Sequence, residues 1–390
     1  MANQAILTPI IDEEEPTQAI GFAKAAKVSG DIGQLSVGQL MWRRFLRNRL
    51  AVGGSVVLIL MYTMILFAEF VIPYDHFISN SDYVTRPPQL PHFIDSEGNF
   101  HLRPFVYGTE TTLDTVNLIY LHKDDLTQIY PIHFFVKAKP YKLFGLIPGN
   151  IHLYGVDAPG TAFFLGTDRN GRDMFSRIVI GGRVSMTVGL VGVILTLIFG
   201  SVLGTASGYF GGIFDTVLQR GIEILMSFPT IALWAAFAAA LPPDITTITR
   251  FFFISIILSL LGWTSLARQV RAKVLAYREM DFASAAKAAG ASHWRIILVH
   301  MLPNALSHII VIATLAIPGM ILAETALSFL GLGIVPPAVS WGALLQDAQT
   351  VAVVLKFPWL MLPGAFVILT VLSFNFIGDG IRDAADPFAI

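Results

Sequence analysis

The sequence of 390 residues contains no cysteine, which excludes disulfides, thiol nucleophiles and cysteine-ligated metals. Charge is also scarce: charged residues make up 14% of the chain, and a formal net charge of -1 gives no general attraction to nucleic acid. A cleavable secretory signal is not expected, because the first apolar run begins at Leu50, after a polar tail with Asp12 and Glu13. Hydrophobic residues make up 54%, with a mean hydropathy of +0.64, which is typical of a membrane protein.

Several apolar runs are long enough to cross a bilayer. A hydrocarbon core of about 30 Å requires roughly 20 apolar residues in a helix. The third run is longer than this and is expected to include turns outside the membrane. The sequence therefore predicts an all-α polytopic membrane protein with about six transmembrane helices, at Leu50–Ile72, Val184–Ala206, Ile213–Leu241, Phe251–Leu266, Ala305–Ala326 and Phe357–Ile377.

Two clusters of basic residues predict the topology. Arginines crowd residues 43–49 before the first span, and further basic residues crowd the loop after the fourth span. Positive charge resists translocation, so both segments are predicted to be cytoplasmic, and an even number of spans places both termini there. The predicted organisation is a cytoplasmic tail and amphipathic segment (1–49), a first span (50–72), an external insert of about 100 residues (73–177) and a core (178–390) with a cytoplasmic loop (271–303).

The external insert carries weak strand signals, at Phe134–Val136 and Asn150–Tyr154, between turn-forming residues. No two of its histidines have the tight spacing of a metal site, so no metal is predicted there. We interpret the insert as a contact surface for a substrate-delivery protein or for a partner subunit. The six histidines in question are His76, His92, His101, His122, His133 and His152.

The cytoplasmic loop contains an alanine-rich segment with features of a docking helix. Asp281 is suited to cap its start, and Gly290 is suited to end it in a left-handed conformation. Ala283, Ala286 and Gly290 recur at i, i+3 and i+7, so one face lacks bulk and another surface could approach it closely. Pro303 is expected to mark a break before the next apolar run.

This segment resembles the EAA loop of ABC importer permeases, whose consensus is Glu-Ala-Ala, three residues, Gly, nine residues and Ile-x-Leu-Pro. The spacing fits, although Ser284 replaces the usual Glu and His300 the usual Ile. In that family the loop is a coupling helix that docks into a groove of a separate ATPase subunit. The resemblance implies an ATPase-coupling role for Asp281, Ala283, Ser284, Ala285, Ala286, Gly290, Arg295, Leu302 and Pro303.

A second segment, Gly166 to Asp173, begins like a phosphate-binding loop but carries Arg172 and Asp173 where Lys and Ser or Thr are required, so no nucleotide site is predicted. It instead resembles the entry to the second span in the dipeptide and oligopeptide permease subfamily. That match continues through GYFGG (208–212), SFP (227–229), AETALSFLGLG (323–333), SWG (340–342) and NFIGDGIRD (375–383).

The resemblance implies the type I ABC importer permease fold, in the bacterial cytoplasmic membrane, with no catalytic residue, metal or cofactor in this chain. Its implied partners are a homologous second permease, two ATP-binding subunits or domains that bind ATP and Mg, and an extracytoplasmic substrate-binding protein. Short peptides are the implied cargo, with opines, oligosaccharides and metal chelates as alternatives.

Inside the spans, Gly200, Gly204 and Gly208 form a stripe that predicts close helix packing, with a moving hinge as the alternative. Ionisable residues are few there, and of these Glu324 is hypothesised to line the translocation path, against a structural hydrogen-bonding role. An ion-coupled secondary transporter would require more acidic residues near mid-membrane. An intramembrane protease is also disfavoured, because GTASG (204–208) does not match Gly-x-Ser-Gly.

Overall fold

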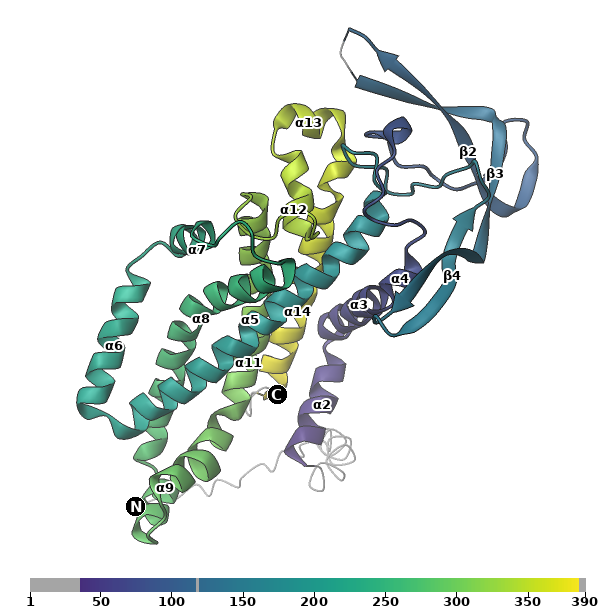
Figure 1. Ribbon diagram of the computed structural model, residues 1–390. Coiled ribbons are helices and arrows are strands. Elements are labelled where there is room, and N and C mark those ends of the chain that lie inside the picture. The colour runs from purple at the N-terminus through teal and green to yellow at the C-terminus, as the bar shows by residue number, and fades with distance from the viewer. Residues whose placement is uncertain (1–35, 117–118, 386–390) are drawn as a thin grey trace, which may run out of the picture.

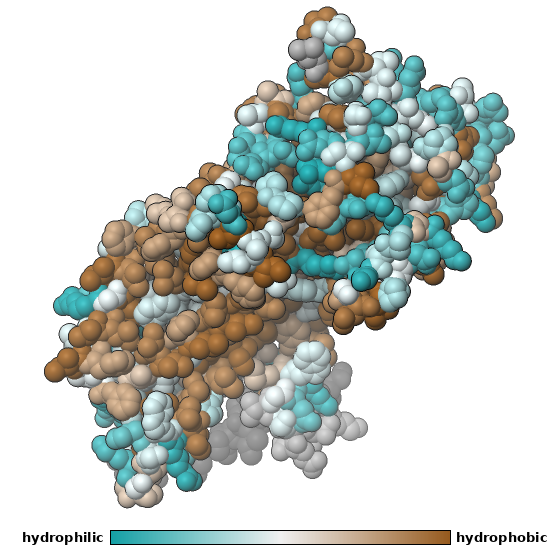
Figure 2. All heavy atoms as spheres, viewed as in Figure 1, coloured by the Kyte–Doolittle hydropathy of each residue, from teal (hydrophilic) through white to brown (hydrophobic). Residues whose placement is uncertain are grey.

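Long apolar helices run side by side, with a β-sheet at one end of the bundle and a short helix, α9 (Asp281–Ala288), at the other (Figure 1). The computed structural model describes residues 36–116 and 119–385. Most of the predicted N-terminal tail therefore lies outside the described residues. On the face shown in Figure 2, apolar side chains cover the helices and polar ones gather over the sheet. This division is typical of a protein that is partly in lipid and partly in water.

The first helices follow directly from capping residues. Helix α2 (Val37–Arg47) begins at Ser36, whose hydroxyl accepts a hydrogen bond from Gln39 N while the Gln39 side chain accepts one from Ser36 N at 3.0 Å, which forms a capping box. Helix α3 (Arg49–Leu66) begins at Asn48, whose side chain accepts from Ala51 N at 3.2 Å. Helix α4 (Ala68–Val71) extends α3 towards the sheet.

Among the described residues, five helices are long and apolar enough to cross a membrane. A sixth span is added if α6 (Gly212–Met226) and α7 (Thr230–Ala239), bent by 84° at the intervening Pro229, count as one. Each predicted span overlaps one of these helices, and the turn expected in the third is this bend. The long helices are α3, α5 (Met174–Phe210), α8 (Thr247–Arg278), α11 (Leu302–Phe329) and α14 (Leu362–Ala385).

The glycine stripe on α5 packs against α8. A Cβ on Gly204 would lie 2.5 Å from Ala267 O, and one on Gly208 would lie 2.8 Å from Arg271 O. These distances leave no room for a side chain, so the two backbones approach each other directly. The stripe is a packing surface in this structure, as predicted.

The insert forms one four-stranded antiparallel sheet in the order β1-β2-β3-β4. The sequence signals found its strand character but not its extent: β3 is 25 residues long and pairs with β2 along its first half and with β4 along its second. The all-α description therefore applies to the membrane part only. The strands are β1 (His92–Ile94), β2 (Phe100–Asp114), β3 (Ile119–Leu143) and β4 (Ile147–Val156).

Short helices fill the space between α11 and α14 at the sheet end of the bundle. Trp341 at the start of α12 (Trp341–Leu345) is fully buried, and its indole donates to Ile178 O of α5 at 2.9 Å. This contact locks the connection onto the core helices. The same connection contains the 3-10 turns η4 (Gln346–Ala348) and η5 (Pro358–Met361) and helix α13 (Val351–Lys356), whereas the 3-10 turn η2 (Ser81–Tyr83) lies in the insert.

Candidate functional site

The predicted docking segment forms α9 (Asp281–Ala288), at the end of the molecule opposite the sheet. Its N-cap is Met280, whose carbonyl accepts from Ala283 N at 3.0 Å and from Ser284 N at 3.2 Å. The prediction that Asp281 caps the helix is wrong, since no side chain caps it. Asp281 instead lies in the first turn, where a negative charge is favourable beside the helix N-terminus.

Gly290 ends the segment as predicted. Its φ is +75°, in the left-handed region, and its N–H donates to Lys287 O at 3.0 Å. The next amide, Ala291 N, donates to Ala286 O at 3.0 Å. These two bonds satisfy carbonyls at the end of α9, and glycine adopts the required conformation without a Cβ clash.

The faces of α9 differ from the predicted arrangement. Ala283 is 5% exposed, and Ala286 and Phe282 are half-buried against a cluster that includes Val274 of α8 and Met301. The small face that contains Ala283 and Ala286 therefore packs against its own chain, because Phe282 pulls that side of the helix inward. The exposed side carries Asp281, Ser284, Ala285 and Ala288, which recur at i, i+3, i+4 and i+7.

This exposed face is small as well, and the sequence contained a signal for it. Phe282 is the one large apolar residue of α9 and lies four residues from Ala286, so together they mark the inward side. The opposite side is then Ser284, Ala285 and Ala288. Ala288 was not among the coupling residues predicted from the sequence.

A second turn of helix, α10 (His293–Arg295), follows Gly290. Ser292 caps it, and the Tyr209 hydroxyl lies 2.7 Å from His293 Nδ1, which ties the turn to the end of α5. Trp294 is 67% exposed, and its neighbour Arg295 is exposed too. Aromatic residues and arginine are enriched at protein contact sites, so this exposed pair marks a candidate contact.

The chain then enters α11 through a π-helical segment, η3 (Ile296–Met301). Met301 is fully buried in the cluster below α9, and Leu302 is half-buried against it. Pro303 is exposed in the first turn of α11, where a missing N–H costs nothing. The predicted break is thus a change of helix type just before the proline.

An ion pair braces the helices above α9. Arg271 of α8 donates to both carboxylate oxygens of Asp215 of α6, at 2.6 and 2.5 Å. The Ser207 hydroxyl at the end of α5 also donates to Asp215. Three helices are therefore joined at one carboxylate next to the docking segment.

Glu324 does not line an open surface in this structure. It is fully buried, and its oxygens accept hydrogen bonds from Ser185 of α5 at 2.9 Å and Ser328 at 2.7 Å. Ser185 in turn accepts from Trp341 N at 3.0 Å. The geometry supports the structural alternative rather than the translocation-path hypothesis, because Glu324 connects α5, α11 and α12 inside the packing.

The segment that imitates a phosphate loop is a buried charge network at the entry to α5. Asp168 is fully buried and accepts from Arg172 Nε at 2.8 Å and from Arg177. Asp173 caps α5 by accepting from Ser176 N at 2.8 Å. Burial raises the pKa of Asp173 to about 6, even though the hydrogen bonds from Ser176 lower it.

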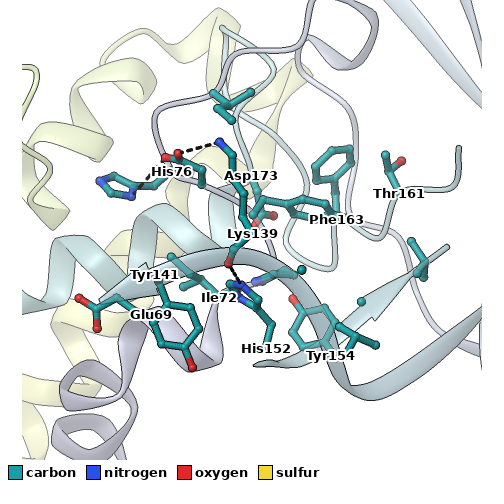
Figure 3. A pocket seen from close by; sticks show the side chains of 18 of the residues that line it. Glu69, Ile72, His76, Lys139, Tyr141, His152, Tyr154, Thr161, Phe163 and Asp173 are labelled. Carbon is teal, nitrogen blue, oxygen red and sulfur yellow. Dashed lines mark hydrogen bonds and ion pairs between the residues drawn. The ribbon is translucent and has the colours of Figure 1, made fainter. Parts of the chain in front are cut away.

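A cavity of about 870 Å³ separates the sheet from the ends of the helices (Figure 3). The ring of His152 points at the backbone of Lys139, and its two nitrogens lie 2.6 Å from Ile72 O and 3.0 Å from Lys139 O. Inside the cavity lining, the Tyr154 hydroxyl and Asp173 Oδ1 are buried without a partner among the described residues. His152 thus joins β3 and β4 to the end of α4.

Two other histidines of the insert lie beside carboxylates. His101 lies 2.8 Å from Asp95, and His133 lies 3.2 Å from Asp157. Within residues 36–116 and 119–385, no group of three His, Cys, Asp or Glu side chains is arranged to hold a metal ion.

The bundle of apolar helices, with its bent helix pair, is that of a multi-pass membrane protein. The family of binding-protein-dependent transport system inner membrane components matches residues 176–389, and the N-terminal transmembrane domain of oligopeptide transport permease C matches residues 36–88. The first match covers more than half of the chain, so this protein belongs to that family. It is a permease of a bacterial binding-protein-dependent ABC importer, in the peptide transporter family.

Several relatives are similar over most of their own length. The oligopeptide transport system permease protein OppC of Haemophilus influenzae is 43% identical over 225 residues, which is 57% of this chain and 70% of that protein. The dipeptide transport system permease protein DppC of Alkalihalophilus pseudofirmus is 42% identical over 233 residues, 60% of this chain and 74% of that protein. The match to a chain of a solved methionine ABC transporter, MetNI, in inward-facing conformations has 19% sequence identity and a TM-score of 0.40. It covers 55% of this chain and 98% of the MetNI chain.

Proposed function

We propose that this permease forms half of a translocation pathway for short peptides, together with a second, homologous permease. Separate ATP-binding subunits hydrolyse ATP and drive the pathway, and an extracytoplasmic protein delivers the peptide. The proposal of peptides is supported by the relatives' names, which describe oligopeptide and dipeptide transport. The single observation that carries the coupling role is α9, a helix with an exposed small-residue face that is fixed from behind by its own chain.

The exposed face is the proposed ATPase contact. Ser284, Ala285 and Ala288 have little bulk, so the groove of a partner can reach the α9 backbone on this side. Trp294, in the turn of helix that follows Gly290, is exposed and suited to anchor a partner, since aromatic residues that become buried contribute much of the binding energy at protein interfaces. Arg295 adds a positive charge at the rim.

The packing behind α9 is suited to carry a displacement into the membrane helices. Ala283 and Ala286 contact the end of α8 and the segment that becomes α11, so α9 cannot shift without moving them. Arg271 and Asp215 extend the connection to α6, and the close glycine packing extends it to α5. Rigid packed elements with two arrangements are the physical means by which a docking event changes a distant site.

The distribution of basic residues supports a topology for the chain. Basic residues crowd α2 and the start of α3, and others crowd the end of α8, and both groups lie at the α9 end of the bundle. We propose that this end and both termini are cytoplasmic and that the sheet is external. The positive-inside tendency supports this orientation.

The test is transport by the native complex. Cells that express the complete transporter are expected to accumulate a labelled dipeptide or tripeptide, and to lose uptake when the partner ATPases carry an inactivating change in their phosphate-binding lysine. Competition with unlabelled peptides, opines, oligosaccharides and nickel chelates then assigns the cargo. Undiminished uptake with inactive ATPases would contradict the coupling proposal, and competition by a non-peptide alone would contradict the peptide proposal.

A further inference from the structure

The turn between β3 and β4 exposes apolar side chains next to the first membrane helix. We call residues 143–147 the hairpin tip. Phe144, Leu146 and Ile147 in it are 47%, 82% and 56% exposed. The tip lies beside the α3–α4 end of the bundle, away from the far edge of the sheet (Figure 1). A water-soluble turn is normally built from polar residues and glycine, so this composition requires an explanation.

Aromatic contacts fix the height of the hairpin tip. The Phe144 ring lies 6.0 Å from the Phe67 ring at the end of α3, and the Phe135 ring lies 6.2 Å from Phe70 in α4. The 18 residues of α3 span about 27 Å, close to the roughly 30 Å thickness of a hydrocarbon core. Phe67 therefore marks the boundary between hydrocarbon and headgroups, and the tip lies at the same level.

Backbone strain occurs at the two phenylalanines that make these contacts. Phe135 has a φ of 56° and Phe144 a φ of 55°, in the left-handed region that ordinary residues avoid. That conformation costs a residue with a Cβ roughly 1–2 kcal/mol. Two phenylalanines kept in it, one in contact with Phe67 at the end of α3 and the other with Phe70 in α4, indicate that the position of these rings matters to the protein.

The surface next to the tip is one that lipid covers. On α3, Ile59, Leu60 and Leu66 are 65%, 64% and 52% exposed, and in a membrane-crossing helix such side chains face acyl chains. The apolar tip continues this surface past Phe67. Figure 2 shows the hydrophobic colouring reaching the base of the polar sheet.

Charge around the tip fits lipid headgroups. The strand that leads into it exposes Lys137, Lys139 and Lys142. Of these, Lys139 forms an ion pair with Asp75, with 3.4 Å between Nζ and Oδ2. Apolar and aromatic side chains bordered by lysines are typical of segments that lie in the interface of a bilayer, where lysines reach the phosphates. A protein partner would fit the apolar residues but would not explain the continuity with the lipid-facing side of α3.

We propose that the hairpin tip inserts into the interface of the leaflet on the sheet's side and anchors the sheet there. Phe144, Leu146 and Ile147 enter the acyl-chain boundary, and Lys142 remains among the headgroups. The anchor holds the sheet, and the cavity beneath it, at a fixed height above the bilayer. This inference is independent of the cargo and of the ATPase partners.

The absence of cysteine provides a direct test. Leu146→Cys, at the tip, and Leu102→Cys, on β2, introduce single labelling sites at leucines that are 82% and 88% exposed in the same sheet. Each full-length variant is labelled with a nitroxide and reconstituted in vesicles of phosphatidylcholine and phosphatidylglycerol. Power-saturation EPR then measures collisions with oxygen, which concentrates in lipid, and with a polar nickel chelate present on both sides of the membrane.

The proposal predicts that the label at position 146 collides with oxygen several-fold more, and with the nickel chelate several-fold less, than the label at position 102. The free nitroxide label in detergent-free buffer gives the collision rates with oxygen and with the nickel chelate that are expected in water. Nickel accessibility at position 146 equal to that at position 102 would overturn the proposal, because the tip would then be in water. A label at 146 shielded from both reagents would also overturn it, because a protein surface would then cover the tip.

Discussion

The close packing of α5 on α8 makes Gly204→Ala the most informative single change to the fold. The added methyl carbon would lie 2.5 Å from Ala267 O and 2.9 Å from Ala267 Cα, and both atoms are backbone. No rotamer change can relieve such a clash, so the two helices must separate. Overpacking of this kind costs about 1–3 kcal/mol.

A matched control exists in α6. A Cβ on Gly221 would meet no heavy atom within 4 Å, so Gly221→Ala gains the helix propensity of alanine without a clash. That gain is about 1 kcal/mol. Gly204→Ala carries the same gain, since Gly204 is also in a helix, so the two variants are expected to differ by the overpacking cost of about 1–3 kcal/mol, with Gly204→Ala the less stable.

Thermal unfolding of the purified protein in detergent measures this difference. We expect the midpoint of Gly204→Ala to fall by several degrees and that of Gly221→Ala to stay level or rise. A Gly204→Ala midpoint at or above the wild-type value would refute the packing argument. In that case the glycine stripe would be a surface for motion rather than for packing, which is the hinge alternative.

Two further predictions concern buried carboxyls. Because burial raises the pKa of Asp173 from 3.8 to about 6, the folded state binds this proton more tightly than the unfolded chain, and stability should rise by on the order of 3 kcal/mol as the pH falls from about 7 to about 4. Asp173→Asn keeps a capping oxygen for α5 and should remove this pH dependence. The prediction is contradicted if the unfolding free energies of the wild type and of Asp173→Asn change with pH in the same way. Glu324→Gln should transport like the wild type, whereas Glu324→Leu leaves the Ser185 and Ser328 hydroxyls without their acceptor and should lose about 1–3 kcal/mol of stability. Lost uptake in a stably folded Glu324→Gln protein would return this residue to the translocation path.

The membrane helices could be predicted from sequence because length and apolarity alone identify a span. The bend in the third span follows from Pro229, which interrupts a helix, but its angle depends on how α6 and α7 pack. The sheet was underestimated for a related reason. Strand β3 contains polar and charged residues along much of its length, and its extent is set by pairing with β2 and β4 rather than by its own alternation.

The docking segment shows the same division. Gly290 was identified because a left-handed helix end requires a residue without a Cβ, which is a local property. The orientation of α9 was not identified, because two small-residue faces exist in the sequence and tertiary contacts of Phe282 choose between them. Likewise, no local pattern shows that Ser185, which lies far from Glu324 in the chain, donates to it.

The central claim, that the exposed face of α9 is the ATPase contact, is best tested by single cysteines in this cysteine-free chain. Ala288→Cys lies on the exposed face, and Ala286→Cys lies on the face that packs against α8 and α11. In inside-out membrane vesicles, a membrane-impermeant maleimide should label position 288 rapidly without the ATPase subunits and slowly with them, while position 286 should react slowly in both. Labelling of position 288 that is unchanged by the ATPase subunits, or that occurs only from the opposite side of the membrane, would contradict the account.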